Sequence, residues 1–194
     1  MLIQETFYLK NMLSYSCIKL IEMVFAQKDS VKLLSVVLGE VTVQFDQEVI
    51  SRHAIVDVFK ELNFDIVRDP DVEIVEKTKI AAIEIIHMSF NANSLIRNSE
   101  YISDKLQLPY DKISKVFSQV TGSTLEKYII LLKIEKAKEM IVNNEYNLSE
   151  IAYMLGYSSV HYLSNQFKQV TGLNVSQYKK DGTHHRKTLD HILD

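Results

Sequence analysis

The chain has 194 residues, of which 46% are hydrophobic and 24% are charged, and this composition predicts one or two folded domains rather than a disordered chain. A single cysteine, Cys17, excludes an internal disulfide framework, and no apolar run approaches the length of a membrane span, so a cytoplasmic location is expected. The net charge of −3 argues against a purely electrostatic nucleic-acid binder, although residues 98–194, with 12 Lys/Arg and 11 Asp/Glu, are weakly basic.

The first 70 residues have the pattern of a small α+β domain. Alternating and β-branched stretches predict strands, and apolar residues at turn spacing predict helices. The predicted elements are a strand at 2–9, a helix at 15–26, strands at 31–38 and 41–45 around a hairpin at Gly39, a helix at 48–62 and a short strand at 64–67. This βαββαβ order predicts a ferredoxin-like domain over residues 1–70.

The loop between the first strand and the first helix resembles the metal loop of heavy-metal-associated domains. That pattern has a methionine followed by two cysteines that are separated by two residues. Met12 and Cys17 match it, but Ser14 stands at the first cysteine position. Because soft ions such as Cu(I) need paired thiolates, we expect no metal and no other cofactor, and the loop is interpreted as a degraded site on a retained fold. A single-thiolate or redox role of Cys17 is the alternative.

Residues 71–97 predict a helix that connects two domains. Isoleucines recur at turn spacing from Ile74 to Ile86, and the polar residues 91–98 then break the pattern. The second domain is therefore expected to begin near residue 98.

The strongest internal signal is a repeat within residues 98–181. Ile102–Gly122 and Ile151–Gly172 close on the near-identical sequences FSQVTG and FKQVTG, fifty residues apart. Each copy predicts two helices joined by a tight turn, and residues 124–142 predict one helix of about 19 residues, roughly 28 Å long. That length would hold two recognition helices near the ~34 Å repeat of one duplex turn. The other interpretation is that the repeated helix pairs only form a symmetric hydrophobic core and do not bind DNA.

The second copy has the clearest helix boundaries. Asn147 and Glu150 predict a capping box, and the first helix should end at Gly156. The second helix should begin near Ser159 and stop at Gly172. Its inner face is expected to hold Leu163, Phe167 and Val170, and its outer face His161, Ser164, Asn165 and Lys168. Small polar side chains on that outer face are what reading the major groove requires, so each copy predicts a helix-turn-helix.

Residues 75–181 resemble the AraC/XylS-type bacterial transcription regulators. The matching segments are Gly156–Ser159, Tyr162–Leu163, Phe167–Lys168, Thr171–Gly172 and Tyr178–Lys180, with Tyr128 and Lys133–Ala137 in the connecting helix. The resemblance implies an all-helical domain with two helix-turn-helix units that binds double-stranded promoter DNA, usually as an activator acting on RNA polymerase. The sequence departs from the family pattern at Val160, where a proline often stands, at Thr124–Leu125 and Asn174–Val175, which replace Ser-Pro, and at Lys133, which replaces a common arginine.

The resemblance also implies which residues read bases. They are Asp111, Ser114 and Lys115 in the first recognition helix and Val160, His161, Ser164 and Asn165 in the second. Lys115 can donate to guanine, Asn165 can pair with adenine, and Asp111 can accept from cytosine or simply cap its helix. Lys112, Gln119, Gln166 and Lys168 are expected at phosphates or in solvent.

No catalytic constellation is present, so the chain is not expected to be an enzyme. Residues 182–194 are interpreted as a loosely ordered polar tail, whose His184, His185 and His191 would bind metal only adventitiously. The ferredoxin-like domain would sense a signal or form a homodimer. A second interpretation makes the chain a metal- or redox-responsive module that docks another protein without binding DNA, and whose affinity would be insensitive to salt.

Overall fold

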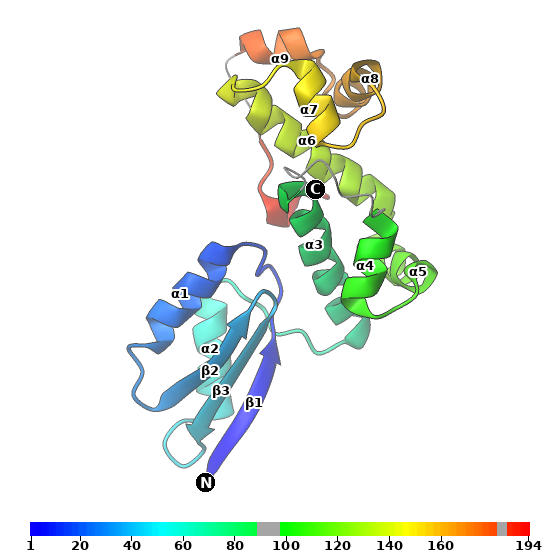
Figure 1. Cartoon of the computed structure of the whole chain (residues 1–194). Coiled ribbons are helices and arrows are strands. Elements are labelled where there is room, and N and C mark those ends of the chain that lie inside the picture. Colours follow the sequence, from blue (N-terminus) through cyan, green and yellow to red (C-terminus); the bar gives the residue numbers. More distant parts are fainter. Residues whose placement is uncertain (89–97, 182–185) are drawn as a thin grey trace. The chain divides into compact units, whose positions relative to one another are not determined.

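The computed structural model describes residues 1–88, 98–181 and 186–194, and the chain divides into two compact units, residues 1–80 and 81–194 (Figure 1). The first unit contains β1 (Leu2–Tyr8), α1 (Tyr15–Phe25), β2 (Val31–Val37), β3 (Glu40–Asp46), α2 (Arg52–Glu61) and the beginning of α3 (Pro70–Met88). The second contains the end of α3, α4 (Asn98–Leu106), α5 (Tyr110–Thr121), α6 (Leu125–Asn143), α7 (Leu148–Met154), α8 (Val160–Thr171), α9 (Val175–Asp181) and a 3-10 turn (Leu189–His191).

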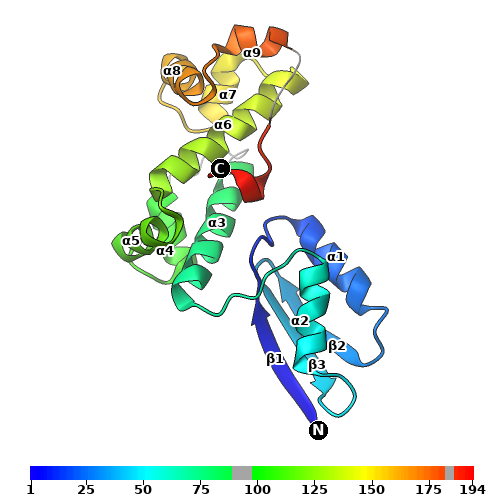
Figure 2. The same ribbon diagram turned by 180° about the vertical axis from the view of Figure 1, so that it is seen from behind.

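The first unit is a three-stranded antiparallel sheet in the order β1-β3-β2, with α1 and α2 on one face (Figure 2). The hairpin between β2 and β3 turns at Gly39, whose φ of 80° suits glycine. Phe59 of α2 anchors the core beneath the sheet, because its ring lies 5.4 Å from that of Phe7 and 5.3 Å from that of Phe25. Such aromatic pairs add about 0.5–1.5 kcal/mol each beyond the area that they bury.

The predicted fourth strand at 64–67 is wrong. This segment forms a single bridge, between Ile66 and Leu9, the residue after β1, and within residues 1–88 the sheet has three strands. Phe64 and Val67 are both buried, and two residues three apart cannot face the same side of a regular strand. The observed order is therefore βαββα, and the complete ferredoxin-like βαββαβ arrangement is not confirmed.

The second unit is built around α6, which buries side chains all around its circumference. Glu135 and Lys138 are 6% and 8% exposed and form an ion pair of 2.6 Å. A charged pair of this kind can be buried because each charge compensates the other. No helix in the ranges covered by the structure is both long enough and apolar enough to cross a bilayer.

Within the second unit, the C-terminal segment 186–194 is bonded to α6. Ile192 is 1% exposed, the Arg186 guanidinium lies 2.8 Å from the Glu139 carboxylate, and the backbone N–H of Lys187 donates to Glu135 at 3.0 Å. The predicted polar tail is therefore wrong for these nine residues, because a buried isoleucine anchors them. Residues 182–185, which include the His184–His185 pair, and residues 91–97 of the predicted polar break lie outside the described ranges.

Candidate nucleic-acid interface

Two helix pairs, α4–α5 and α7–α8, lie at opposite ends of α6 and pack on it (Figures 1 and 2). The second helix of each pair ends in the same way. The hydroxyls of Thr121 and Thr171 donate to the carbonyl four residues earlier, at 2.7 and 2.8 Å. The chain then turns at Gly122 or Gly172, whose φ angles of 70° and 78° suit glycine. The sequence repeat is thus also a repeat of backbone geometry.

The cores of the two pairs correspond as well. The ring of Phe117 lies 5.4 Å from that of Tyr128, and the ring of Phe167 lies 5.3 Å from that of Tyr178. Each aromatic pair joins the second helix of a copy to the helix that follows it. The predicted offset of fifty residues therefore holds for the core contacts.

The turns inside the two pairs differ by one residue. Gln107 and Gly156 both have positive φ, 53° and 68°, and the next residue of each, Leu108 or Tyr157, donates its N–H to the carbonyl five residues earlier. The offset is 49 residues here and fifty beyond the turn, so the second turn is one residue longer. The two recognition helices consequently begin differently.

The predicted helix boundaries of the second copy are confirmed. The Asn147 side chain accepts from the N–H of Glu150 at 3.0 Å, and the Glu150 carboxylate accepts from the N–H of Asn147 at 2.7 Å, which completes the capping box. Ser159 caps α8 by accepting from the N–H of Tyr162 at 3.1 Å. In the first copy Pro109 is the N-cap and offers no side-chain bond. Because Ser159 supplies the cap of α8, this helix can begin at Val160 without the proline that the family often has at that position.

The predicted base-reading residues lie on the outer faces of α5 and α8. Asp111 and Lys115 are exposed and Ser114 is half-buried, whereas on α8 His161 and Asn165 are exposed and Val160 and Ser164 are half-buried. Positions 111, 114 and 115 of α5 correspond to 161, 164 and 165 of α8. The inward placement expected for Val170 is wrong, because its side chain is 37% exposed at the end of α8.

His161 and Asn165 are joined by a hydrogen bond on the exposed face of α8. Asn165 Nδ2 lies 3.0 Å from His161 Nε2, one helical turn away. An amide nitrogen can only donate, so the imidazole nitrogen is the acceptor.

A second side-chain contact joins α8 to Tyr157, in the turn that precedes this helix. The Tyr157 hydroxyl donates to Gln166 Oε1 at 2.6 Å, and Lys133 Nζ of α6 lies 5.3 Å from the centre of the Tyr157 ring. Burial lowers the pKa of the Lys133 ammonium, and burial followed by the charge of Tyr162 raises the pKa of Tyr157 well above its ordinary value. Gln166 was expected at a phosphate or in solvent, but its side chain is half-buried and bonded to Tyr157. Sequence spacing gave no signal for this tertiary contact.

Exposed cations flank the recognition helices. They are Lys112 and Lys115 on α5, Lys127 in the first turn of α6, Lys168 on α8 and Lys180 on α9, and Gln119 of α5 is also exposed. Flexible ammonium groups of this kind can contact phosphates without selecting a sequence.

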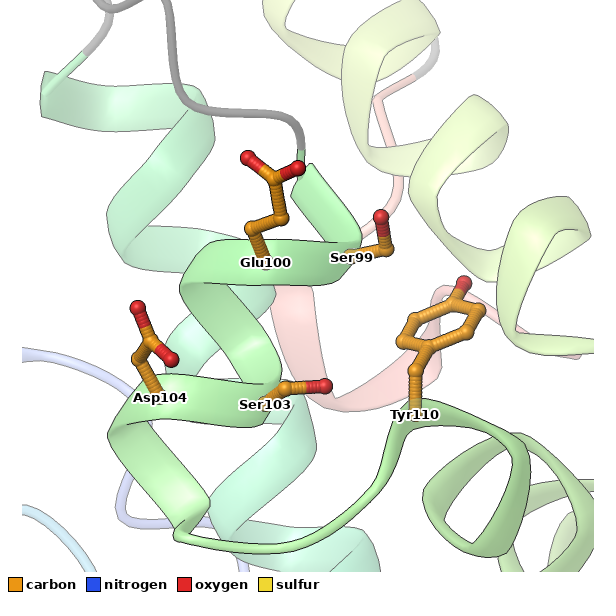
Figure 3. Close-up of a pocket in the computed structure, with 5 residues that line it drawn as sticks. All are labelled: Ser99, Glu100, Ser103, Asp104 and Tyr110. Atoms are coloured by element: carbon orange, nitrogen blue, oxygen red, sulfur yellow. The ribbon is translucent and has the colours of Figure 1, made fainter.

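An open hollow of about 360 Å³ lies between α4 and the start of α5 (Figure 3). Its lining residues are Ser99, Glu100, Ser103, Asp104 and Tyr110. Two carboxylates repel a phosphate, so we do not place nucleic acid in this hollow.

The loop that resembles a metal site does not fit a soft metal ion. Met12 is 0% exposed and belongs to the core, while the Oγ of Ser14, the N-cap of α1, lies 3.4 Å from the Sγ of Cys17 in the first turn of that helix. A hydroxyl and one thiol replace the paired thiolates that such ions require. In the parts of the chain that the structure covers, no three His, Cys, Asp or Glu residues are grouped to hold a metal.

Residues 102–181 match a family model described as "Helix-turn-helix domain". The Msm operon regulatory protein of Streptococcus mutans is 24% identical over 98 residues, which cover 50% of this chain and 34% of that protein. The xylose operon regulatory protein of Escherichia coli is 24% identical over 118 residues, which cover 57% and 30%. The C-terminal domain of AraT, a response regulator from Geobacillus stearothermophilus, is 24% identical with a TM-score of 0.45, covering 57% of this chain and 88% of that structure.

The chain spans about a third of the length of these curated relatives, at 34% and 30%. The similarity is therefore one of a domain. The matched segment begins in α4 and ends in α9, so it includes both helix pairs and the central α6. Residues 102–181 form a helix-turn-helix domain similar to those of bacterial operon regulators.

Proposed function

We propose that this protein is an AraC/XylS-type transcription regulator that binds a specific DNA sequence with α5 and α8. The observation that carries the proposal is the repeat: the second helix of each pair presents polar side chains at equivalent exposed positions, and one central helix holds both pairs. The match of residues 102–181 to a helix-turn-helix domain agrees with this role.

In the proposed mechanism, α5 and α8 enter successive segments of the major groove. Side chains of Lys115 and Asn165 contact base edges, where donor and acceptor patterns distinguish all four base pairs. Lysines such as Lys112, Lys127 and Lys168 contact phosphates and set the register. The 19 residues of α6 span roughly 28 Å at 1.5 Å per residue, which supports a separation of about one duplex turn.

The remaining parts of the proposal concern regulation. The N-terminal unit, with its three-stranded sheet, is a reduced relative of the ferredoxin-like fold that senses a signal or forms a homodimer, and it holds no cofactor. The curated relatives are named as operon regulators, so RNA polymerase is the proposed partner at the promoter, with activation as the outcome.

The test is selection of bound sequences from a random duplex library by the full-length protein, followed by footprinting of the enriched site. We expect two protected major-groove segments about one turn, ~34 Å, apart and an affinity that falls steeply with salt. Replacing Lys115 and Asn165 by alanine should cost about 1–3 kcal/mol per lost base contact on this site and leave binding to random DNA unchanged. The control, Lys127→Ala, should weaken binding to all sequences equally.

Absence of enrichment, together with capture of a protein partner whose affinity does not depend on salt, would refute the proposal. It would favour instead the metal- or redox-responsive docking module.

A further inference from the structure

The hydrogen bond between His161 and Asn165 restricts one of the proposed base-reading side chains. Asn165 Nδ2 donates to His161 Nε2 at 3.0 Å, and both side chains are exposed on α8. Since Nε2 accepts in this bond, the bonded tautomer carries its ring proton on Nδ1. The bond therefore favours one orientation of the Asn165 amide group in the free protein.

In this orientation the bond to His161 uses neither of the two groups that adenine requires. The amide nitrogen has two protons, of which one is bound to His161, so a second N–H and the carbonyl oxygen remain. In the major groove adenine offers N7 as an acceptor and the N6 amino group as a donor, which match that N–H and that oxygen. Without a partner, the terminal torsion of asparagine is broad and roughly two-fold, so both orientations would be populated.

We infer that His161 is a positioning residue that fixes the Asn165 amide so that α8 reads an adenine. The inference rests on the proposed function and specifies the base chemistry of one recognition helix. His161 acts through Asn165 and stays bonded to it when DNA is bound.

The equivalent positions of α5 lead to a different base. Asp111 and Lys115 are also one turn apart and exposed, but a carboxylate can only accept and an ammonium can only donate. Lys115 matches the two acceptors of guanine, and Asp111 matches the amino group of cytosine. The α5 segment of the site is thus expected to contain a G·C pair and the α8 segment an adenine.

The experiment compares full-length wild type with His161→Ala, His161→Gln and Asn165→Ala on the sequence that wild type selects. Wild type should prefer adenine at one position of the α8 segment by about 5- to 150-fold, and Asn165→Ala should abolish this preference. His161→Ala should weaken the preference by about 2- to 12-fold, the effect of releasing one ordered side chain. His161→Gln should retain it, because a glutamine oxygen can accept from Asn165. Gln169→Ala, at an exposed position of the same helix α8, is the matched control and should leave the adenine preference unchanged.

A spectroscopic measurement tests the bond itself without DNA. Long-range proton–nitrogen correlation spectra should show His161 in the tautomer protonated at Nδ1, and Asn165→Ala should remove this bias. Full discrimination by His161→Ala, or a selected site without adenine in the α8 segment, would overturn the inference while the two-segment footprint upheld the proposed function. Failure of wild type to select any sequence would overturn both.

Discussion

Replacing Gly156 by alanine tests whether the turn between α7 and α8 depends on a left-handed backbone. The residue has a φ of 68°, a conformation that costs a residue with a Cβ about 1–2 kcal/mol. A Cβ at this position would meet only Lys133 Nζ, at an ordinary distance of 3.7 Å, so the cost is in the backbone and not in crowding. Alanine also lowers the conformational entropy of the unfolded chain, and this offsets about 0.4–1 kcal/mol of the cost in folding free energy. The expected net destabilisation is about 1 kcal/mol.

The equivalent turn of the first copy gives a different result. Gln107 already occupies the left-handed region, with a φ of 53°, so Gln107→Gly relieves about 1–2 kcal/mol of backbone strain. Glycine, however, loses more freedom on folding, about 0.5–1 kcal/mol. The substitution also removes the hydrogen bond of 2.6 Å from Gln107 Nε2 to the carbonyl of Asp104, worth about 0.5–1.5 kcal/mol. These effects nearly cancel, and we expect Gln107→Gly to be close to neutral.

Urea unfolding of the full-length protein, followed by far-ultraviolet circular dichroism, measures both substitutions. The helices of the second unit dominate this signal. A midpoint for Gly156→Ala equal to that of wild type, at the same slope, would refute the reasoning, and so would a stabilisation of about 1 kcal/mol by Gln107→Gly.

Three further outcomes are expected. Ile192→Ala should lower the free energy of unfolding by about 2–5 kcal/mol and Ile192→Val by about 0.5–1.5 kcal/mol, both in the same urea assay. Two equally small effects would mean that the C-terminal segment does not pack on the rest of the second unit. Burial, and then the hydrogen bond to Glu126, raises the pKa of Tyr110 from 10.0 to about 12. The folded state therefore keeps a proton that the unfolded chain loses, so stability falls as the pH rises through this range. In an ultraviolet titration, wild type should show a transition near pH 12 that Tyr110→Phe lacks. Ser14→Cys should raise the affinity for Zn(II) sharply in a chelator competition under reductant. The reason is that the separation of 3.4 Å between Ser14 Oγ and Cys17 Sγ is close to the ~3.8 Å between two sulfurs on tetrahedral zinc. An unchanged affinity would mean that the loop is not a metal site.

The repeat was predictable from the sequence because its signals are local. Glycines stop the helices, Asn147 and Ser159 cap them, and apolar residues at turn spacing fill each core. The absence of the fourth strand was not predictable from apolar content alone, because the run of residues 64–67 suits a strand. The single bridge between Leu9 and Ile66 and the burial of both Phe64 and Val67, three residues apart, show that the segment is not a regular strand.

Charge and tertiary contacts limited the prediction of the site. A sequence of alternating Glu and Lys does not reveal that Glu135 and Lys138 are buried as a pair. The outer positions of α5 and α8 followed from the repeat and from the resemblance to a family, but the contact of Lys133 with Tyr157 joins different helices. The orientation of the Asn165 amide is a matter of side-chain torsion, which spacing does not specify.

The presence of two unequal helix pairs in one chain gives the proposed complex a direction. A two-fold symmetric dimer places identical readers in opposite senses and therefore selects palindromes. Here α5 and α8 carry different residues and follow one another along a single polypeptide, so one molecule would distinguish the two ends of its site. Bound to a promoter, it would present one defined side toward the transcription start, and inverting the site would turn that side away.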